Sequence, residues 1–309
     1  MILTITLNPS VDISYKLEAF NLDTVNRVAD VSKTAGGKGL NVSRVIQQLG
    51  EDVAASGFLG GSLGQFIRSE ISDQGIENFF VSIAGDTRNC IAVIHKGQQT
   101  EILETGPTIN ETEATEFLNK FSEDVQKVDL VTISGSLPKG LDKDFYSQLV
   151  EIANQHDTPV LLDTKGELLR HTLRGDSKPF LIKPNQEELA DLLGEKVTDD
   201  AQIISALQSQ TFSGVPWVVV TTGATGAFVK HNQEVYRATT PKVDAVNPVG
   251  SGDSVVAGFA AGISRGLTDI ELVKYGLSMG VLNAMEATTG SINPENISWC
   301  KDQIRVESI

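Results

Sequence analysis

One stretch of the chain places small residues directly before a carboxylate: Asn247-Pro248-Val249-Gly250-Ser251-Gly252-Asp253-Ser254. Apolar residues follow at helical spacing, so we expect Asp253 in the first turn of a helix. The segment Gly250–Gly252 lets several backbone N–H groups point at one anion, and the helix dipole adds partial positive charge. This pattern suits phosphoryl transfer, with Asp253 accepting the proton of an acceptor hydroxyl. Alternatively, the glycines form a tight turn and Asp253 only complements the dipole.

A second glycine-rich segment opens another predicted helix: Gly36-Gly37-Lys38-Gly39-Leu40-Asn41. Its spacing differs from that of a Walker A loop, so it is not the phosphate loop of that class. Gly37 still lets the backbone approach a ligand closely, while Lys38 can reach an anion and Asn41 can bond a hydroxyl. The alternative is a glycine turn followed by a solvated lysine.

Further side chains that could bind a phosphate occur in two settings. The loop Ser134-Gly135-Ser136-Leu137-Pro138-Lys139-Gly140 directly follows a predicted strand. There Ser136 can donate to a phosphate oxygen, and Lys139 can balance its charge. Arg27 and Arg88 occur in β-like stretches, where a guanidinium can bind a phosphate through two parallel hydrogen bonds. Either arginine could instead be a solvated side chain on an exposed strand.

Two later loops could face a nucleotide. Lys183-Pro184-Asn185-Gln186-Glu187-Glu188 ends one strand, and Thr221-Thr222-Gly223-Ala224-Thr225-Gly226 follows another. Asn185 and Glu188 predict a capping box at a helix start, and their oxygens could also lie near a nucleotide's magnesium, acting through water. The glycines of the second loop would let the backbone pass close to a nucleotide, or simply form a turn.

One motif favours a different class of enzyme. Gly60-Gly61-Ser62-Leu63-Gly64 matches the G-x-S-x-G nucleophile elbow and lies between a predicted strand and a predicted helix. A hydrolase triad would also need a later acid and a histidine, and none of the four histidines lies in a loop with evident catalytic company. Ser62 is adequately explained as a helix N-cap.

Composition narrows the choice of ligand and compartment. The chain has 25 Lys and Arg against 40 Asp and Glu, a formal net charge of −15, and an acidic surface repels nucleic acid and anionic membranes. Anionic metabolites would therefore need locally clustered Lys and Arg. Cys90 and Cys300 form neither a disulfide framework nor a zinc motif, and no apolar run approaches the roughly 18 residues of a membrane span. We expect a reduced cytoplasmic protein with no nucleic-acid or membrane partner.

Strands and helices alternate through most of the chain, and this order predicts the elements that must position these residues. Short apolar runs separated by helical stretches are typical of a buried parallel sheet: Leu130–Ser134, Val160–Asp163, Phe180–Lys183 and Trp217–Thr221. Such sheets carry helices on both faces and bind ligands beyond the carboxyl ends of their strands. We expect one three-layer α/β/α domain over residues 1–309 with a mostly parallel central sheet.

Two segments break this alternation. Residues 11–33 contain β-like pieces such as Val11–Tyr15 and Arg27–Val31, and residues 87–103 predict a hairpin. We place these insertions in a small separate β-sheet that forms a lid over the site. We also expect a short strand over Val243–Val246, leading into the glycine turn of the first motif.

Taken in order, these segments resemble the ribokinase-like sugar kinases, also called the PfkB carbohydrate kinases. The matches span nearly the whole chain: Asn8-Pro9-Ser10-Val11-Asp12, Gly36–Asn41, Ser134–Pro138, Lys183–Glu188, Thr221–Gly226 and Gly250–Asp253. The ordered set is far more specific than any member, and the first and third segments are most similar to the phosphosugar branch of the family. The family usually has Thr-x-Gly-Ala-Gly-Asp, whereas this chain has Pro248 and Ser251 there, a change that bears on subfamily more than on reaction.

The resemblance implies roles for the matching positions. Asp253 would be the general base, with Gly250, Ser251 and Gly252 in the anion hole. Sugar hydroxyls would be held by Asp12, Gly37 and Asn41, and the existing phosphate by Arg27, Lys38, Arg88 and Ser136. ATP and Mg²⁺ would face Lys183, Asn185, Glu188, Thr221, Gly223 and Gly226, and Asn283 would border the adenine. From its helix-terminal position we expect Asp253 to stay ionised and to be a weak base.

The implied reaction moves the γ-phosphate of ATP to the C1 hydroxyl of D-tagatose 6-phosphate, giving D-tagatose 1,6-bisphosphate and ADP, as in lactose and galactose catabolism. Phosphorylation of fructose 1-phosphate at C6, or of another phosphoketohexose such as fructose 6-phosphate, is the alternative. A non-catalytic nucleotide- or sugar-binding protein and an α/β hydrolase are further alternatives. The family lid often pairs with that of a second subunit, so the resemblance also implies a homodimer through the lid sheets.

Overall fold

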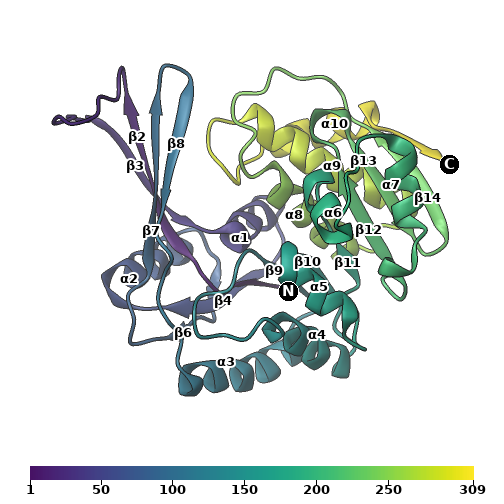
Figure 1. Ribbon diagram of the computed structural model, residues 1–309, viewed down its shortest axis with the longest axis horizontal. Coiled ribbons are helices and arrows are strands. Elements are labelled where there is room, and N and C mark those ends of the chain that lie inside the picture. Colours follow the sequence, from purple (N-terminus) through teal and green to yellow (C-terminus); the bar gives the residue numbers. More distant parts are fainter.

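The computed structural model describes residues 1–309 and contains one large and one small β-sheet (Figure 1). The large sheet has 11 strands in the order β15-β14-β13-β12-β11-β10-β9-β1-β4-β5, with β6 paired to β4 beside this path. Neighbours from β5 to β12 are parallel, and those from β12 to β15 are antiparallel. The strands are β1 Ile2–Thr6, β4 Val53–Leu59, β5 Glu77–Asn78, β6 Val81–Ser82, β9 Leu130–Ser134, β10 Val160–Asp163, β11 Leu181–Ile182, β12 Trp217–Thr221, β13 Ala227–His231, β14 Glu234–Thr239 and β15 Arg305–Ser308.

Helices cover both faces of the large sheet, which confirms the expected α/β class (Figure 1). One face carries α1 Lys38–Gln48, α2 Gly61–Asp73, α8 Ser251–Ser264, α9 Asp269–Met285 and α10 Ile297–Gln303. The other carries α3 Glu111–Asp124, α4 Phe145–Gln155, α5 Gly166–Arg174, α6 Gln186–Leu193 and α7 Asp200–Leu207. None of these helices has the length and apolar composition needed to cross a membrane.

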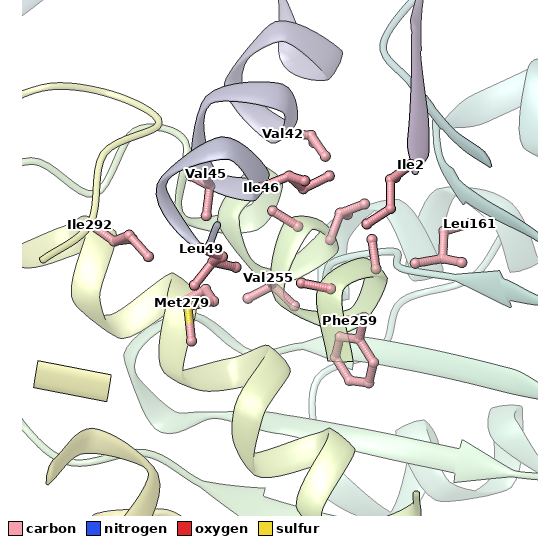
Figure 2. Packing of buried hydrophobic residues seen from close by; sticks show 14 of the residues in the cluster. Ile2, Val42, Val45, Ile46, Leu49, Leu161, Val255, Phe259, Met279 and Ile292 are labelled. Carbon is pink, nitrogen blue, oxygen red and sulfur yellow. The ribbon is translucent and has the colours of Figure 1, made fainter. Parts of the chain in front are cut away.

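Two hydrophobic cores form because the central strands bury both of their sides. On β1, Ile2 belongs to one core and Leu3 to the other. Figure 2 shows the first core, where Leu49 at the end of α1, Val255 of α8 and Met279 of α9 meet. This packing sets α1 and α8 side by side on the sheet, so that their two glycine-led starts come together.

The small sheet contains the two insertions and has the order β3-β2-β7-β8. Its strands are β2 Ser10–Leu17, β3 Asp30–Gly36, β7 Arg88–His95 and β8 Gln98–Leu103, with β2 and β7 parallel and the other pairs antiparallel. Figure 1 shows these strands standing away from the helical layers, and β8 is exposed along its whole length. Because β3 ends at Gly36 and α1 begins at Lys38, Gly37 alone joins the small sheet to α1.

The prediction of a strand over Val243–Val246 is wrong, since residues 240–250 contain no strand. Val246 is 64% exposed, and the preceding strand β14 has no free side for it because β14 already pairs with both β13 and β15. The backbone N–H groups of Val246 and Asn247 instead donate to the carbonyl of Ala284, near the end of α9, at 2.7 and 3.1 Å. The glycine turn before Asp253 is therefore approached by a loop held on α9.

Other elements also differ from the expectation. The antiparallel edge formed by β13, β14 and β15 was not predicted, and neither was α5. The expected β-like piece Arg27–Val31 begins too early, because β3 starts at Asp30 and continues to Gly36. Arg27 consequently lies in the exposed loop between β2 and β3 rather than in a strand.

Candidate active site

Asp253 lies in the first turn of α8, as expected, and is 6% exposed. The helix begins after Gly250, whose φ of +83° is left-handed; a Cβ there would lie 2.6 Å from Cγ2 of Thr289. Both the backbone conformation and the contact therefore require glycine at this turn. From the start of α1, Asn41 Nδ2 donates to Asp253 Oδ2 at 2.7 Å. The two glycine motifs thus meet at one carboxylate.

The pKa of Asp253 is raised to about 6, chiefly because burial penalises the ionised carboxylate. Lys38, the hydrogen bond from Asn41 and Lys183 act in the opposite direction, while Asp163 adds to the rise. The expectation that Asp253 is a weak base is therefore wrong, because burial outweighs the helix terminus. A carboxylate with a pKa just below neutrality accepts a proton more readily than an ordinary one and is still largely ionised at pH 7.

A second carboxylate, which sequence reasoning missed, lies at the end of β10. The Asp163 side chain is 1% exposed, and its Oδ2 accepts from Lys38 Nζ at 3.2 Å. Its Oδ1 is 3.2 Å from Nζ of Lys183, and a Cβ on Gly252 would lie 3.3 Å from that same nitrogen. Asp163 therefore holds two ammonium groups beside the anion turn. The available signal was a carboxylate at the end of an otherwise apolar strand.

The charges in this cluster stabilise one another. Burial acts to raise the pKa of Asp163, but Lys183 and Lys38 outweigh it and the pKa is lowered. Burial likewise acts to lower the pKa of Lys38, yet Asp163, Asp253 and Glu188 together raise it. Lys38 and Asp163 are therefore both ionised at neutral pH.

Asp12 lies on β2, where the small sheet meets the large one. Ser10 Oγ donates to its Oδ1 at 2.6 Å, and burial raises its pKa against the effects of Ser10, Arg44 and Arg88. Gly36 of β3 packs directly against it, since a Cβ there would lie 2.0 Å from Asp12 Cγ. The first residue of the double glycine thus makes room for the carboxyl group. Gly37, the N-cap of α1, has a φ of +109°.

Besides Lys38, four residues are expected to bind the sugar phosphate, and the structure brings them less closely together than the groups around Asp253. They are Arg27, Arg88, Ser136 and Lys139. The Arg88 guanidinium donates to the carbonyl of Asn8 at 3.0 Å and to that of Glu104 at 2.8 Å, which directs it along the base of the small sheet. Ser136 and Lys139 are exposed in the loop after β9. The backbone carbonyl of Lys139 accepts from Ile109 at 2.8 Å. The structure does not bring Lys139 or the exposed Arg27 into contact with Arg88.

Asn185 and Glu188 form the predicted capping box at the start of α6. Glu188 N donates to Asn185 Oδ1 at 2.8 Å, and Asn185 N donates to Glu188 Oε2 at 2.9 Å. The structure contains no group of three or more Asp, Glu, His or Cys side chains that could by itself hold a metal ion. A magnesium ion held mainly by phosphate oxygens and water, with one nearby carboxylate, fits this arrangement, because Mg²⁺ is usually bound in that way.

The loops after β11 and β12 are neighbours. Asn185 forms a β-bridge with Thr221, and Thr221 N donates to the carbonyl of Pro184 at 3.1 Å. Gly223 is exposed with a φ of +64°. Gly226, in contrast, is buried, and a Cβ there would lie 2.1 Å from the carbonyl oxygen of Ala238. The close backbone approach that requires Gly226 is therefore to β14 and not to a ligand.

The expectation that Asn283 borders the adenine is wrong. Its side chain is fully buried, and both ends of its amide are bonded within the protein. Nδ2 donates to the carbonyl of Val249 at 2.9 Å, while Oδ1 accepts from Ser254 Oγ at 3.0 Å and from Gly290 N at 2.9 Å. Asn283 instead fixes the anion turn to α9 and to the loop that follows it.

The hydrolase alternative is not supported. Ser62 lies inside α2, whose N-cap is Gly60, so the expected capping role of Ser62 is also wrong. No histidine is hydrogen-bonded to Ser62, and the Ser62 side chain is not part of the cluster around Asp253. The close approach of Gly60 is to the carbonyl of Gly85, where a Cβ would meet that oxygen at 1.9 Å.

Comparison with known proteins finds one matching family over most of the chain. The profile of the pfkB family carbohydrate kinases matches residues 5–296. The chain is 52% identical over 307 residues to the tagatose-6-phosphate kinase of Staphylococcus epidermidis, covering 99% of both chains.

Solved structures give the same picture. The phosphofructokinase-2 of Escherichia coli in complex with potassium is similar with a TM-score of 0.90 and 27% identity, covering 97% of this chain and 98% of that one. A possible 1-phosphofructokinase of Thermotoga maritima is similar with a TM-score of 0.90 and 27% identity, covering 100% and 99%.

Proposed function

The chain belongs to the pfkB family of carbohydrate kinases, and we propose that it transfers the γ-phosphate of ATP to the C1 hydroxyl of D-tagatose 6-phosphate. The products would be D-tagatose 1,6-bisphosphate and ADP, a step in lactose and galactose catabolism. The choice of substrate depends on the 52% identity to a tagatose-6-phosphate kinase. The proposed chemistry depends on one observation: Asp253, in the first turn of α8, accepts a hydrogen bond from Asn41 at the start of α1, so that the two glycine motifs lie together.

Asp253 acts as the general base on the sugar hydroxyl. With a pKa raised to about 6, it can take the hydroxyl proton as the new O–P bond forms. The backbone N–H groups of Gly250, Ser251 and Gly252, at the start of α8, stabilise charge on the transferred phosphoryl group. Lys183 is held beside this turn by Asp163 and adds positive charge there.

The sugar lies between the small sheet and α1. Asp12, Gly37 and Asn41 hold its hydroxyls, and Lys38, Arg88, Ser136, Arg27 and Lys139 contribute to binding the existing phosphate. Each charge-assisted hydrogen bond of this kind is worth about 1.5–3 kcal/mol. Two or three of them would exclude unphosphorylated sugars and offset the net charge of −15.

ATP lies against the loops after β11 and β12, near Lys183, Thr221 and Gly223. Asn185 and Glu188 would hold Mg²⁺ through water, and the ion would neutralise charge on the phosphates. The small sheet forms a lid on a single domain of residues 1–309, and its exposed strand β8 supports pairing with a second copy in a homodimer. We place the enzyme in the cytoplasm.

A coupled assay of ADP release tests this proposal. The assay would compare tagatose 6-phosphate, fructose 1-phosphate, fructose 6-phosphate and unphosphorylated tagatose at equal concentrations. We expect the highest kcat/KM for tagatose 6-phosphate and none above background for the free sugar. Higher kcat/KM with fructose 1-phosphate would favour the second candidate, which the similarity to a possible 1-phosphofructokinase supports. Ligand-induced thermal stabilisation without ADP release would indicate a non-catalytic binding protein.

A further inference from the structure

Arg44 of α1 forms hydrogen bonds to three segments that lie near Asp253. Its side chain is partly buried, and Nη1 donates to the carbonyl of Ala35 at 2.5 Å. Nη2 donates to Oδ1 of Asn41 and, at 3.3 Å, to the carbonyl of Thr289. Arg44 therefore contacts the same Asn41 that bonds to the catalytic carboxylate.

These contacts determine which way the Asn41 amide points. A guanidinium has only N–H donors, so the amide must present its oxygen to Arg44. Its NH₂ group then faces Asp253, as the 2.7 Å bond from Nδ2 to Oδ2 shows. A reversed amide would set two donors against each other at Arg44 and two oxygens against each other at Asp253. The orientation is consequently enforced from both sides.

The surroundings of this pair are closely fitted. A Cβ on Gly290 would lie 3.0 Å from Cα of Asn41 and 3.2 Å from Nη2 of Arg44. Gln48, one turn further along α1, donates to the carbonyl of Gly290 at 3.4 Å and accepts from Ile292 N at 2.8 Å. The loop after α9 therefore closes over Asn41 and Arg44 and leaves little freedom for the amide to turn.

We propose that Arg44 is a positioning residue, which holds the Asn41 amide so that it donates to the ionised carboxylate of Asp253. This inference rests on the proposed role of Asp253 as the base. Arg44 does not touch the reacting groups, and it acts through Asn41 and through its positive charge.

The charged groups around both side chains set the direction of the effect. Arg44 is faced by Asp12 of β2, Asp253 of α8 and Glu70 of α2. Asp253 is faced in addition by Lys38 of α1, Asp163 of β10 and Lys183 after β11. Loss of Arg44 removes one cation and frees the Asn41 amide, and both changes raise the pKa of Asp253.

The pH profile of kcat tests the proposal with Arg44→Met. We expect its acidic limb to move upward by about one unit, which lowers kcat at pH 6 about five-fold while kcat at pH 8 recovers to within about two-fold of wild type. Arg44→Lys, which keeps the charge, should move the acidic limb upward by less than Arg44→Met does. An equal loss of kcat at every pH would show a merely structural role and overturn the proposal.

A double-mutant cycle tests whether the effect passes through Asn41. Asn41→Ala should itself move the acidic limb upward, and Arg44→Met should move it less in the Asn41→Ala background than in wild type, because only the loss of charge remains. Full additivity of the two shifts would overturn the route through Asn41. Arg68→Met is the matched control, since Arg68 also holds a backbone carbonyl, that of Phe80, but lies outside the site; it should leave the limb unmoved.

A titration of the substrate-free protein tests the role of Arg44 without depending on which sugar is the substrate. The pKa of Asp253 can be followed by ¹³C NMR of labelled aspartate in the substrate-free protein, with Asp253→Asn identifying the signal. A higher pKa in Arg44→Met supports the proposal even if tagatose 6-phosphate is not the substrate, and an unchanged pKa overturns it. If Arg44→Met does not fold, Arg44→Lys and Asn41→Ala decide by the same titration.

Discussion

The carboxyl edge of the large sheet and the small sheet hold charged groups in opposite surroundings. At the edge of the large sheet, Asp163, Lys183 and Asp253 are 1%, 5% and 6% exposed, and each has a charged or hydrogen-bonding partner. In the small sheet, β8 is exposed throughout, and Arg88 bonds only to backbone carbonyls. The groups assigned to the chemical step are therefore buried and closely partnered. Of the groups assigned to the sugar phosphate, Arg88 is only partly buried, and Arg27, Ser136 and Lys139 are exposed in loops.

This contrast predicts that changes at the large sheet affect turnover and stability, and that changes at the small sheet affect substrate affinity. Asp253→Asn should lower kcat at least about 10²-fold with little change in KM, because the base is lost while the binding groups remain. Steady-state kinetics would measure this effect. Turnover near that of wild type would exclude Asp253 as the base.

The same variant should be more stable than wild type. The pKa of Asp253 is higher in the folded protein than the usual 3.8, so ionisation above pH 4 favours the unfolded chain. At pH 7 we expect Asp253→Asn to gain about 1–3 kcal/mol in the free energy of unfolding, at about 1.4 kcal/mol per pKa unit. Urea denaturation would test the sign.

Asp163→Ala should be strongly destabilising, because it leaves the buried ammonium of Lys183 without a partner. Breaking a buried ion pair from one side costs about 3–5 kcal/mol, and urea denaturation would measure it. The control is Asp129→Ala, whose side chain is 73% exposed and pairs with the N-terminus. An exposed pair of this kind contributes less than about 1 kcal/mol, so similar losses in both variants would contradict the comparison.

Arg88→Ala should raise the KM for the phosphosugar about 10- to 100-fold while the KM for ATP holds. The loss corresponds to one charge-assisted interaction of about 1.5–3 kcal/mol. Lys16→Ala, on the same sheet in an exposed pair with Asp30, should change neither constant by more than about two-fold. Equal losses of affinity for both substrates after Arg88→Ala would show that the small sheet does not act on the sugar alone.

The pH dependence of wild-type kcat is the smallest expected effect. Asp253 must be ionised to accept a proton, so kcat should fall about two-fold between pH 8 and pH 6 and about ten-fold by pH 5. Burial also raises the pKa of Asp12, so the KM for the sugar can change in the same range, and kcat at saturation is the proper measure. A constant kcat down to pH 5 would show that burial does not control the base.

Sequence reasoning succeeded where the signal was local. The glycine turns before α1 and α8, the position of Asp253 in a first helical turn and the capping box of Asn185 all depend on residues within a few positions of one another. Alternating strands and helices were sufficient to predict the class of fold, because each strand buries both sides between helical layers.

The failures involve distant neighbours. Asp163 had only a weak local signal, and its partners Lys38 and Lys183 reach it only when β10 lies beside the start of α1 and the end of β11. Arg44 bonds locally to Asn41, but the link from Asn41 to Asp253 exists only when α1 and α8 are side by side. Val243–Val246 contains apolar residues, but the strand before it, β14, is already paired on both sides. The pKa of Asp253 likewise depends on burial beneath other elements, which a helix-terminal position alone does not describe.

The single residue between β3 and α1 has a mechanical consequence. Gly37 is the only link between a strand that contacts the proposed sugar site and the helix that carries Lys38 and Asn41. Because the connection has no slack, a tilt of that strand is concentrated in the backbone angles of Gly37, while the packing of α1 on α8 and β1 holds the helix in place. We therefore expect Gly37 to be the hinge about which the small sheet moves relative to α1.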